Sequence, residues 1–284
     1  MRLRIDFGYD GREFIGWAMQ PGLRSVEQTL SEACGTILRS QIPRLTIAGR
    51  TDAGVHARGA VCHLDVDPRA YKTLPARSGR EPAEAAARRL NGVLPADIVV
   101  HRVREAAPGF DARFSALSRR YSYRICDDPS TRDPLRRHDT VFVKQSLDPA
   151  LLNEAAAHLM GLNDFASFCK RREGATTVRT LLEYRWERIA DGTLVATVIA
   201  DAFCHSMVRS LVGVVLPVGD GTRQPQWPAQ VMSGRRRHPA VKVMAPHGLC
   251  LEEISYPADD RLAARAAQAR TTRELPGTSA AEAG

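Results

Sequence analysis

The sequence predicts an α+β fold built from two ferredoxin- or RRM-like halves. Strand-like alternation and helix-like spacing of apolar residues interleave in the first half, and a similar succession returns in the second half. Asp191-Gly192 separates two strand-like runs, LLEYRWERIA and TLVATVIA, which indicates a hairpin. A chain of 284 residues with 44% hydrophobic residues can bury a sizeable core. We therefore expect the halves to join into one mixed, mainly antiparallel sheet, with a central cleft and with helices on the opposite face.

The elements expected in the first half follow the spacing of the apolar residues. In order, they are strand 2–7, turn 9–11, helix 26–38, strand 44–49, strand 60–66, helix 82–90 and strand 97–104. Residues 67–82 interrupt this pattern with prolines and basic residues, a composition typical of a long mobile loop.

The second half repeats the theme. Its expected elements are strand 119–126, helix 149–159, strand 180–189, strand 193–200, helix 203–216, helix 228–233 and strand 249–254. We accordingly expect an N-terminal half at 1–106 and a C-terminal half at 107–257. The Ala-, Arg-, Thr- and Gly-rich segment 258–284 has the composition of a disordered tail that begins as frayed helix.

Charge and cysteine content limit the classes of function. Forty Lys and Arg residues against thirty-two Asp and Glu give a net charge of +8, which favours phosphate-bearing partners. The six cysteines form no C-x-x-C pair and are expected to be reduced thiols in a cytoplasmic protein. With no signal-peptide pattern and no run of eighteen apolar residues, we expect neither secretion nor membrane insertion.

The stretch AGRTDAGVHARG, residues 48–59, follows a predicted strand and places Asp52 among glycines. Gly49 and Gly54 permit a sharp turn and a close approach of the backbone to a ligand. Asp52 could be a nucleophile, a general base, a metal ligand or a turn-capping residue, and capping is the commonest role of an aspartate beside glycine.

A metal site and a phosphate loop both find little support near Asp52. His56 lies four residues after Asp52, but no H-E-x-x-H motif or paired cysteine spacing accompanies them. The patterns G-x-x-x-x-G-K-[ST] and G-x-G-x-x-G are absent from the sequence. Arg50 and Arg58 flank Asp52, and this setting favours an ionised carboxylate that acts as nucleophile or base.

The stretch AGRTDAGVHARGAV resembles the signature of the TruA-type tRNA pseudouridine synthases. Five further blocks resemble that family in the same order: YDGREFIGW (9–17), FDARFSALSRRYSY (110–123), NDFASF (163–168), DAFCHSMVRSLVG (201–213) and HGLCLEEISY (247–256). The resemblance covers roughly residues 1–256, and the Arg-Thr-Asp block is the specific one.

The resemblance implies a role for each matching residue. Asp52 would be the catalytic aspartate and nucleophile, supported by Arg50 in the same turn and by Arg209, which would pair with its carboxylate. Tyr121 would stack on the target base, and Leu249 would line the apolar wall of the site. Taken alone, Tyr121 could equally be a strand core residue, Arg209 a solvated helix position and Leu249 ordinary sheet packing.

The resemblance also implies the reaction and the partners. Uridine would become pseudouridine at positions 38 to 40 of the tRNA anticodon stem-loop, with no cofactor and no metal, and a homodimer would bind tRNA across both subunits. The target base must leave its stack to reach Asp52. Whether Asp52 attacks C1′, adds to C6 or removes a proton at C2′ stays open.

Basic clusters are candidates for contacts with the RNA backbone, although a basic run is often a solvated face. The candidates are Arg58, Arg119-Arg120, Arg136-Arg137, Lys170-Arg171-Arg172 and Arg235-Arg236-Arg237.

Three features depart from the family pattern. Gly59-Ala60-Val61 stands where Gly-Gln-Val is usual, His205-Ser206 stands where His-His is common, and the 67–82 loop is long. These differences bear on which tRNA positions are chosen rather than on the reaction.

Two alternatives belong to other classes. A non-catalytic RNA-binding protein with two RRM-like halves would carry an aromatic-rich RNP1 block, which this sequence lacks. A metal-dependent hydrolase is the third hypothesis.

Overall fold

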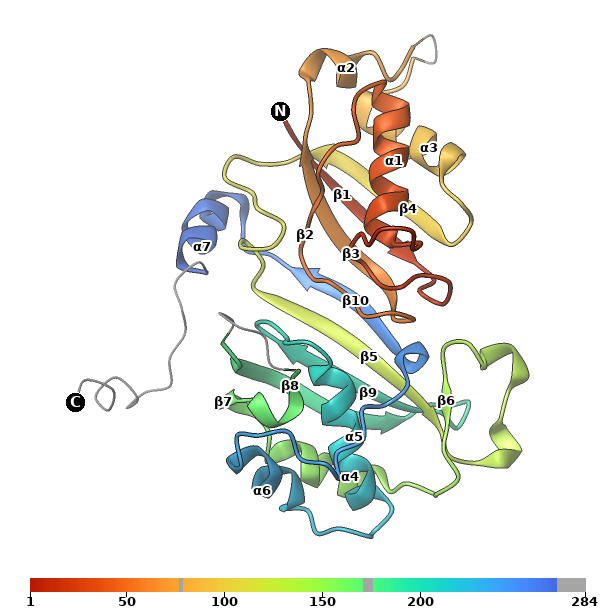
Figure 1. The fold of residues 1–284 in the computed structure, drawn as a ribbon, viewed down its shortest axis with the longest axis vertical. Coiled ribbons are helices and arrows are strands. Elements are labelled where there is room, and N and C mark those ends of the chain that lie inside the picture. Colours follow the sequence, from red (N-terminus) through yellow and green to blue (C-terminus); the bar gives the residue numbers. More distant parts are fainter. Residues whose placement is uncertain (77–78, 171–175, 270–284) are drawn as a thin grey trace, which may run out of the picture. The chain divides into compact units, whose positions relative to one another are not determined.

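The computed structural model describes residues 1–76, 79–170 and 176–269, which divide into two compact units (Figure 1). Unit 1 consists of Met1–Leu117 together with Leu251–Arg270, whereas the described part of unit 2 lies within Ser118–Cys250. Both units combine helices with mainly antiparallel strands. The predicted α+β class is therefore confirmed.

The sheet of unit 1 is built around its first strand. Strand β1 (Arg2–Tyr9) lies between β3 (His56–Asp65) and β4 (Ile98–Glu105) and is antiparallel to both. The two-residue strand β2 (Thr46–Ile47) pairs with β3. Alternate residues of β1 face the core, as expected for a strand with one buried face, and these are Leu3, Ile5 and Phe7.

Helices α1 (Val26–Leu38) and α3 (Pro82–Val93) pack against one another, and α3 also packs against β4. Helix α1 begins where the Ser25 hydroxyl accepts a hydrogen bond from the Gln28 amide. It ends at Arg39, which adopts a left-handed conformation and donates its N–H to the last-turn carbonyls. Helix α3 begins with Pro82, whose missing N–H costs nothing in the first turn.

Two stretches of unit 1 are more ordered than the sequence predicts. Helix α2 (Pro68–Lys72) lies within the expected mobile loop 67–82, and its Tyr71 is buried. Helix α7 (Leu262–Gln268), preceded by the short helix η5 (Asp259–Arg261), lies within the expected disordered tail. The Ser115 hydroxyl donates to the Leu262 carbonyl oxygen, which ties α7 to unit 1. Residues 259–268, which we expected to be frayed or disordered, therefore form ordered helices. The rest of that tail, 270–284, lies outside the described residues.

Strand β10 (Leu249–Ser255) carries the chain from unit 2 back into unit 1. Within unit 1 it passes very close to β3, because a Cβ atom on Gly59 would collide with the Glu252 carbonyl oxygen. Glycine at position 59 is therefore required by the approach of two backbones.

The sheet of unit 2 contains the predicted hairpin. Strands β8 (Val178–Arg188) and β9 (Leu194–Ala200) are antiparallel neighbours, and β9 also pairs with β5 (Ser118–Cys126). Two short strands complete the sheet: β7 (Gly161–Asp164) pairs with β8, and β6 (Val141–Phe142) runs parallel to β5.

Three helices pack together in unit 2. Helix α5 (Met207–Gly219) contacts both α4 (Pro149–Ala157) and α6 (Trp227–Ser233), and α4 also packs against β8 (Figure 1). Most of α5 is buried, so it behaves as a core helix rather than an amphipathic one. Gly213 is needed there because a Cβ atom would collide with the Lys242 carbonyl oxygen.

The cysteine prediction is wrong for one pair. Cys169 and Cys204, which are 35 residues apart in the sequence, form a disulfide in unit 2. The other four cysteines, Cys34, Cys62, Cys126 and Cys250, are free and buried. Nothing in the spacing of Cys169 and Cys204 indicates the pairing, because it depends on the approach of two loops.

Candidate functional site

Asp52 lies in the loop that connects β2 to β3. These strands are antiparallel neighbours, with Thr46 opposite His63 and Ile47 opposite Cys62. The connection between them is far longer than a hairpin turn, and Asp52 lies within it, beyond the ends of β2 and β3 that it joins. Asp52 is half-buried and forms an isolated β-bridge with Gly16.

Segment 9–17 holds this loop on both sides of Asp52. The Trp17 amide donates to the Thr51 carbonyl oxygen at 3.1 Å, and the Gly54 amide donates to the Phe14 carbonyl oxygen at 3.2 Å. The Tyr9 and Thr51 hydroxyls are hydrogen-bonded at 2.7 Å in a buried position. Two sequence blocks of the family resemblance are thus one structural unit, and the backbone next to Asp52 is fixed by it.

The close fit between the two segments depends on glycine. Gly16 has φ of +103°, and a Cβ atom there would lie 2.7 Å from the Thr51 carbonyl oxygen. Gly54 also has a positive φ, which allows the turn after Asp52. A Cβ atom on Gly11 would collide with the Val55 backbone. The contact between segment 9–17 and the Asp52 loop therefore extends to the residue just before β3.

His56 is the first residue of β3, and its Nδ1 atom faces the 9–17 segment. It accepts a hydrogen bond from the Gly11 amide at 3.1 Å and lies 3.2 Å from the Asp10 carboxylate. Burial alone would raise the pKa of Asp10, but hydrogen bonds from Arg12 and the nearby His56 bring it below its ordinary value. His56 is therefore engaged in holding the loop.

The two arginines that flank Asp52 are both exposed. Arg50 precedes Asp52 in the same loop. Arg58 lies on β3 and forms an ion pair with Glu252 of β10, with Nη1 and Oε1 2.6 Å apart. This ion pair lies within unit 1, beside Gly59.

The remaining predicted site residues belong to unit 2. Tyr121 on β5 lies opposite Val198 of β9, is 6% exposed, and packs edge-to-face on Phe203 with ring centroids 5.1 Å apart. Arg209 lies in the first turn of α5, and its Nε donates to the Met244 carbonyl oxygen at 2.6 Å. Leu249 is buried at the start of β10.

Tyr123, which is not among the predicted site residues, shares this part of unit 2. Its hydroxyl donates to the Ala245 carbonyl oxygen at 2.8 Å. Burial raises the pKa of Tyr123, and the positive charge of Arg209 opposes that rise. Gly248 fits against the Tyr123 ring, since a Cβ atom there would lie 2.9 Å from it. Side chains alternate between the two faces of β5, so Tyr121 and Tyr123 lie on the same face. This alternation is the sequence signal that could have identified Tyr123.

The structure brings Arg209 and Tyr123 together, and segment 244–249 lies with them in unit 2. Asp52 lies in unit 1, so its predicted ion pair with Arg209 joins residues of different units and stays a prediction.

The predicted RNA contacts differ in exposure. Arg119 is 8% exposed and donates from Nη1 to the Asp201 carbonyl oxygen at 2.6 Å, so it supports the unit 2 backbone. Arg120 is half-buried, and Lys170 is exposed. Arg171 and Arg172 lie outside the described residues. Contact of these residues with RNA stays a prediction.

Membrane-spanning helices and metal clusters are both absent from the described ranges. No helix among these residues combines the length and apolar character needed to span a bilayer. Across the same residues, no three His, Cys, Asp or Glu side chains gather in a way that could hold a metal ion.

Comparison with known proteins gives consistent matches. A family model described as "tRNA pseudouridine synthase" matches residues 155–257. A protein of Streptomyces griseus subsp. griseus named tRNA pseudouridine synthase A is 52% identical over 279 residues, covering 98% of this chain and 95% of that protein. Proteins of the same name from Leifsonia xyli subsp. xyli and Frankia casuarinae are 50% and 51% identical, covering 96% and 97% of this chain and 98% and 97% of theirs.

Proposed function

This chain belongs to the tRNA pseudouridine synthase A family, and we propose that it uses Asp52 to convert uridine to pseudouridine at positions 38 to 40 of the tRNA anticodon stem-loop. The enzyme is an isomerase that acts on tRNA. The observation that carries the role of Asp52 is its position in a loop whose backbone is fixed on both sides by segment 9–17. A carboxylate held in this way is preorganised for chemistry on a bound nucleotide.

The reaction suits a single carboxylate. The N1–C1′ bond of uridine breaks, the uracil turns, and a C5–C1′ bond forms. N1 ends with a proton and C5 loses one, so no oxidant, reductant or transferred group is needed. Asp52 acts as nucleophile in this proposal, at C1′ of the ribose or at C6 of the base, and removal of a proton at C2′ is the third route.

The other assigned residues would bind and support. Tyr121 would stack on the flipped base, Leu249 would form the apolar wall, and Arg209 would pair with the Asp52 carboxylate, with Arg50 shaping the same turn. These roles require the two sheets to join and leave a cleft between them. Strand β10 supports this requirement, because its first residues belong to unit 2 and its remainder to unit 1.

We further propose that the enzyme is a cytoplasmic homodimer that binds tRNA across both subunits. The net charge of +8 favours association with the RNA backbone. Arg58, Arg120 and Lys170, with Arg171 and Arg172, are the proposed backbone contacts, whereas the burial of Arg119 favours a supporting role. The alternative of a non-catalytic RNA-binding protein has no comparable support, since relatives about half identical over nearly the whole chain are named as synthases.

The test is tritium release from tRNA labelled at C5 of uridine, carried out with EDTA present. The full-length protein should release tritium and form pseudouridine in the anticodon stem-loop. Asp52→Asn removes the charge without changing the shape, so single-turnover conversion should fall roughly a thousand-fold or more while tRNA affinity is retained.

Asp65→Asn is the matched control, because it removes an exposed carboxylate of unit 1 that pairs with Arg2 across the sheet. Its conversion rate should equal that of the unaltered protein. Substantial activity of Asp52→Asn in a preparation free of host enzyme would remove Asp52 from the mechanism.

A further inference from the structure

A basic pocket lies in unit 2, at the end of β5, and has a volume of about 210 Å³. Segment 131–142, which follows β5, supplies most of its lining, and Cys126 of β5, the β8–β9 turn and His247 supply the rest. Three arginines and one aromatic ring are the part of the lining that matters for binding: Arg132, Arg136, Arg137 and Phe142. None of these residues carries a role in the proposed reaction.

Two of the three guanidinium groups have no carboxylate partner among the residues that the structure describes. Arg136 is paired with Asp139 at 2.8 Å. Arg132 instead lies over the Phe142 ring, 4.6 Å from its centroid, and Arg137 donates from Nη1 to the Pro134 carbonyl oxygen at 3.0 Å. Both arginines are exposed, so they can meet an anion from solution.

The two carboxylates in the lining are occupied by other contacts. Asp133 accepts the Leu135 amide at 2.8 Å at the start of the short helix η2 (Pro134–Arg136). Asp191 accepts the Thr193 amide at 2.9 Å and pairs with Arg124 at 3.4 Å. Because Arg124 offsets the charge of Asp191, the pocket keeps an excess of positive charge.

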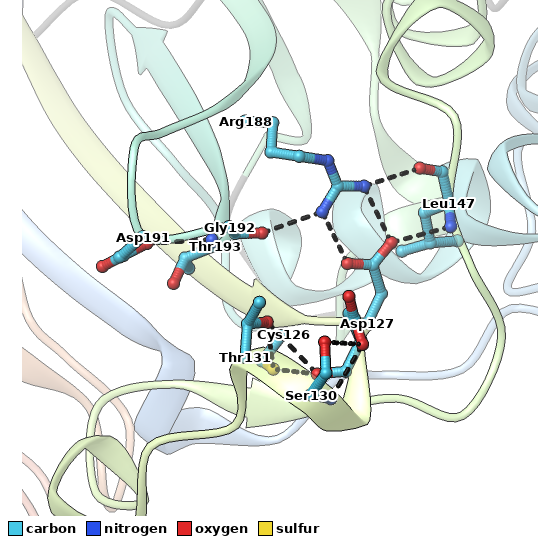
Figure 2. A network of polar contacts seen from close by, with 10 residues as sticks. Cys126, Asp127, Ser130, Thr131, Leu147, Arg188, Asp191, Gly192 and Thr193 are labelled. Atoms are coloured by element: carbon cyan, nitrogen blue, oxygen red, sulfur yellow. Dashed lines mark hydrogen bonds and ion pairs between the residues drawn. The ribbon is translucent and has the colours of Figure 1, made fainter.

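An ion pair behind the pocket fixes its wall (Figure 2). Arg188 donates to both oxygens of the buried Asp127 carboxylate, at 2.7 and 2.9 Å. The same guanidinium donates to the Gly192 and Leu147 carbonyl oxygens, and the Leu147 amide donates back to Asp127 at 2.8 Å. We call these four residues the Asp127 corner.

The Asp127 corner fastens the β8–β9 turn to the end of β5. Gly192 stands in that turn with φ of +84°, and a Cβ atom there would lie 2.9 Å from the Thr131 side chain. The residues on either side of Gly192 line the pocket. The wall is therefore in place before any ligand arrives, which lowers the cost of binding.

The size and chemistry of the pocket fit one phosphate group. Its volume of about 210 Å³ is below the roughly 300–1,000 Å³ of pockets that enclose drug-sized ligands. Arginine binds phosphate oxygens with two parallel N–H donors.

We propose that this pocket binds a backbone phosphate of tRNA through Arg132 and Arg137, an assignment that rests on the proposed function. It is an anchoring site that adds affinity without reading the sequence, because phosphate contacts position a nucleic acid but carry little base information.

The test compares two double variants of the full chain. Arg132→Ala with Arg137→Ala removes the two pocket cations that form no ion pair among the described residues. Arg44→Ala with Arg88→Ala removes two arginines of unit 1, the second on α3, and is the matched control for charge. Affinity for a tRNA transcript is measured over a range of salt, and thermal unfolding checks that each variant folds.

The pocket variant should weaken tRNA binding and lower the slope of log affinity against log salt by about one to two. The control should leave the slope unchanged. Arg132→Lys keeps the charge but loses the flat contact with Phe142, so it should preserve the slope and recover part of the affinity. If the double variant is unstable, Arg137→Gln alone should lower the slope by at most about one.

Titration with inorganic phosphate distinguishes the source of the phosphate. Loss of inorganic phosphate binding in the pocket variant, with an unchanged tRNA slope, would assign the pocket to a free anion and overturn the tRNA assignment. An unchanged slope with no phosphate binding to either protein would overturn the site altogether. Failure of the proposed function has a different signature, since the unaltered protein would then form no pseudouridine whatever the slopes.

Discussion

The loop that carries Asp52 in unit 1 is held through the main chain of its neighbours Thr51 and Gly54. The Asp127 corner of unit 2 is held through the carboxylate of Asp127 itself. Both aspartates follow a strand and both have arginines nearby in the sequence. Backbone hydrogen bonds and glycines hold the loop of Asp52 in place. In the Asp127 corner, by contrast, the charged carboxylate itself connects the elements of the fold.

The first prediction breaks the Asp127 corner. Asp127→Asn should lower the free energy of unfolding by about 3 kcal/mol, because Arg188 loses the buried negative charge that it pairs with. The hydrogen bonds from Arg188 to the Gly192 and Leu147 carbonyl oxygens should weaken as well. Asp65→Asn is the control, since the Arg2–Asp65 pair has similar geometry but is exposed, and it should cost at most about 1 kcal/mol. Denaturant unfolding of both variants measures the difference.

The pH dependence sharpens this prediction. Burial alone would raise the pKa of Asp127, but hydrogen bonds from Arg188 and the Leu147 amide bring it below its ordinary value. A carboxylate with a lowered folded-state pKa contributes its full stability above the unfolded-state pKa of about 3.9 and loses it as the pH falls further. The gap between the unaltered protein and Asp127→Asn should therefore be constant from neutral pH to about pH 5 and narrow below about pH 4. A gap independent of pH would mean that packing, rather than charge, holds the corner.

The second prediction disturbs the Asp52 loop. Gly16→Ala forces a Cβ atom to within 2.7 Å of the Thr51 carbonyl oxygen at a φ of +103°, so the loop must shift. A shift of about 1 Å in a catalytic group can lower the rate about a hundred-fold, and we expect that loss in single-turnover conversion with tRNA binding retained.

Gly22→Ala is the control for Gly16→Ala. Gly22 also has a positive φ, of +73°, but no atom of the described residues would lie within 4 Å of a Cβ atom at this position. The substitution should lower stability slightly and leave the rate of conversion unchanged. Equal rates for the two variants would show that the close contact with Thr51 at Gly16 does not determine the rate of conversion.

The third and smallest prediction removes single hydroxyl groups from the two units. Tyr9→Phe loses the hydrogen bond to Thr51, and Tyr184→Phe loses the buried hydrogen bond to the Leu211 carbonyl oxygen. Each should cost on the order of 1 kcal/mol of stability. Tyr9→Phe should also slow conversion, by at most about five-fold, because Tyr9 holds the Asp52 loop and Tyr184 does not. Equal rates for both variants would indicate that the other contacts with segment 9–17 are sufficient.

Long periodic elements could be predicted from the sequence, and short ones could not. Helix α1 begins and ends where predicted, because the Ser25 cap and the buried apolar spacing are both local signals. Strands β6 and β7 were not predicted, since a few residues carry no periodicity and depend on neighbouring strands. Helix α7 was expected only as frayed helix, because its Ala- and Arg-rich composition gives no sign of the hydrogen bond from Ser115 that holds it in place.

The candidate site could be predicted in part. Asp52 was identified by its motif, and the glycines around it indicated a tight turn. The hydrogen bonds between segment 9–17 and the Asp52 loop could not be predicted. Nothing in the sequence of either segment indicates contacts between residues some forty positions apart. The same limit applies to the pocket of unit 2: the sequence indicates Arg137 as a candidate RNA contact, but not the pocket, which the distant β8–β9 turn and His247 complete.

The division of unit 1 into Met1–Leu117 and Leu251–Arg270 also governs the order in which the protein can be completed during synthesis. The ribosome must produce all of Ser118–Cys250 before it produces the part of β10 that lies against β3. A nascent chain that ends inside unit 2 therefore contains the Asp52 loop and segment 9–17. The side of β3 that β10 will contact is still uncovered in such a chain. Among the described residues, unit 1 is therefore synthesised first in part and completed last.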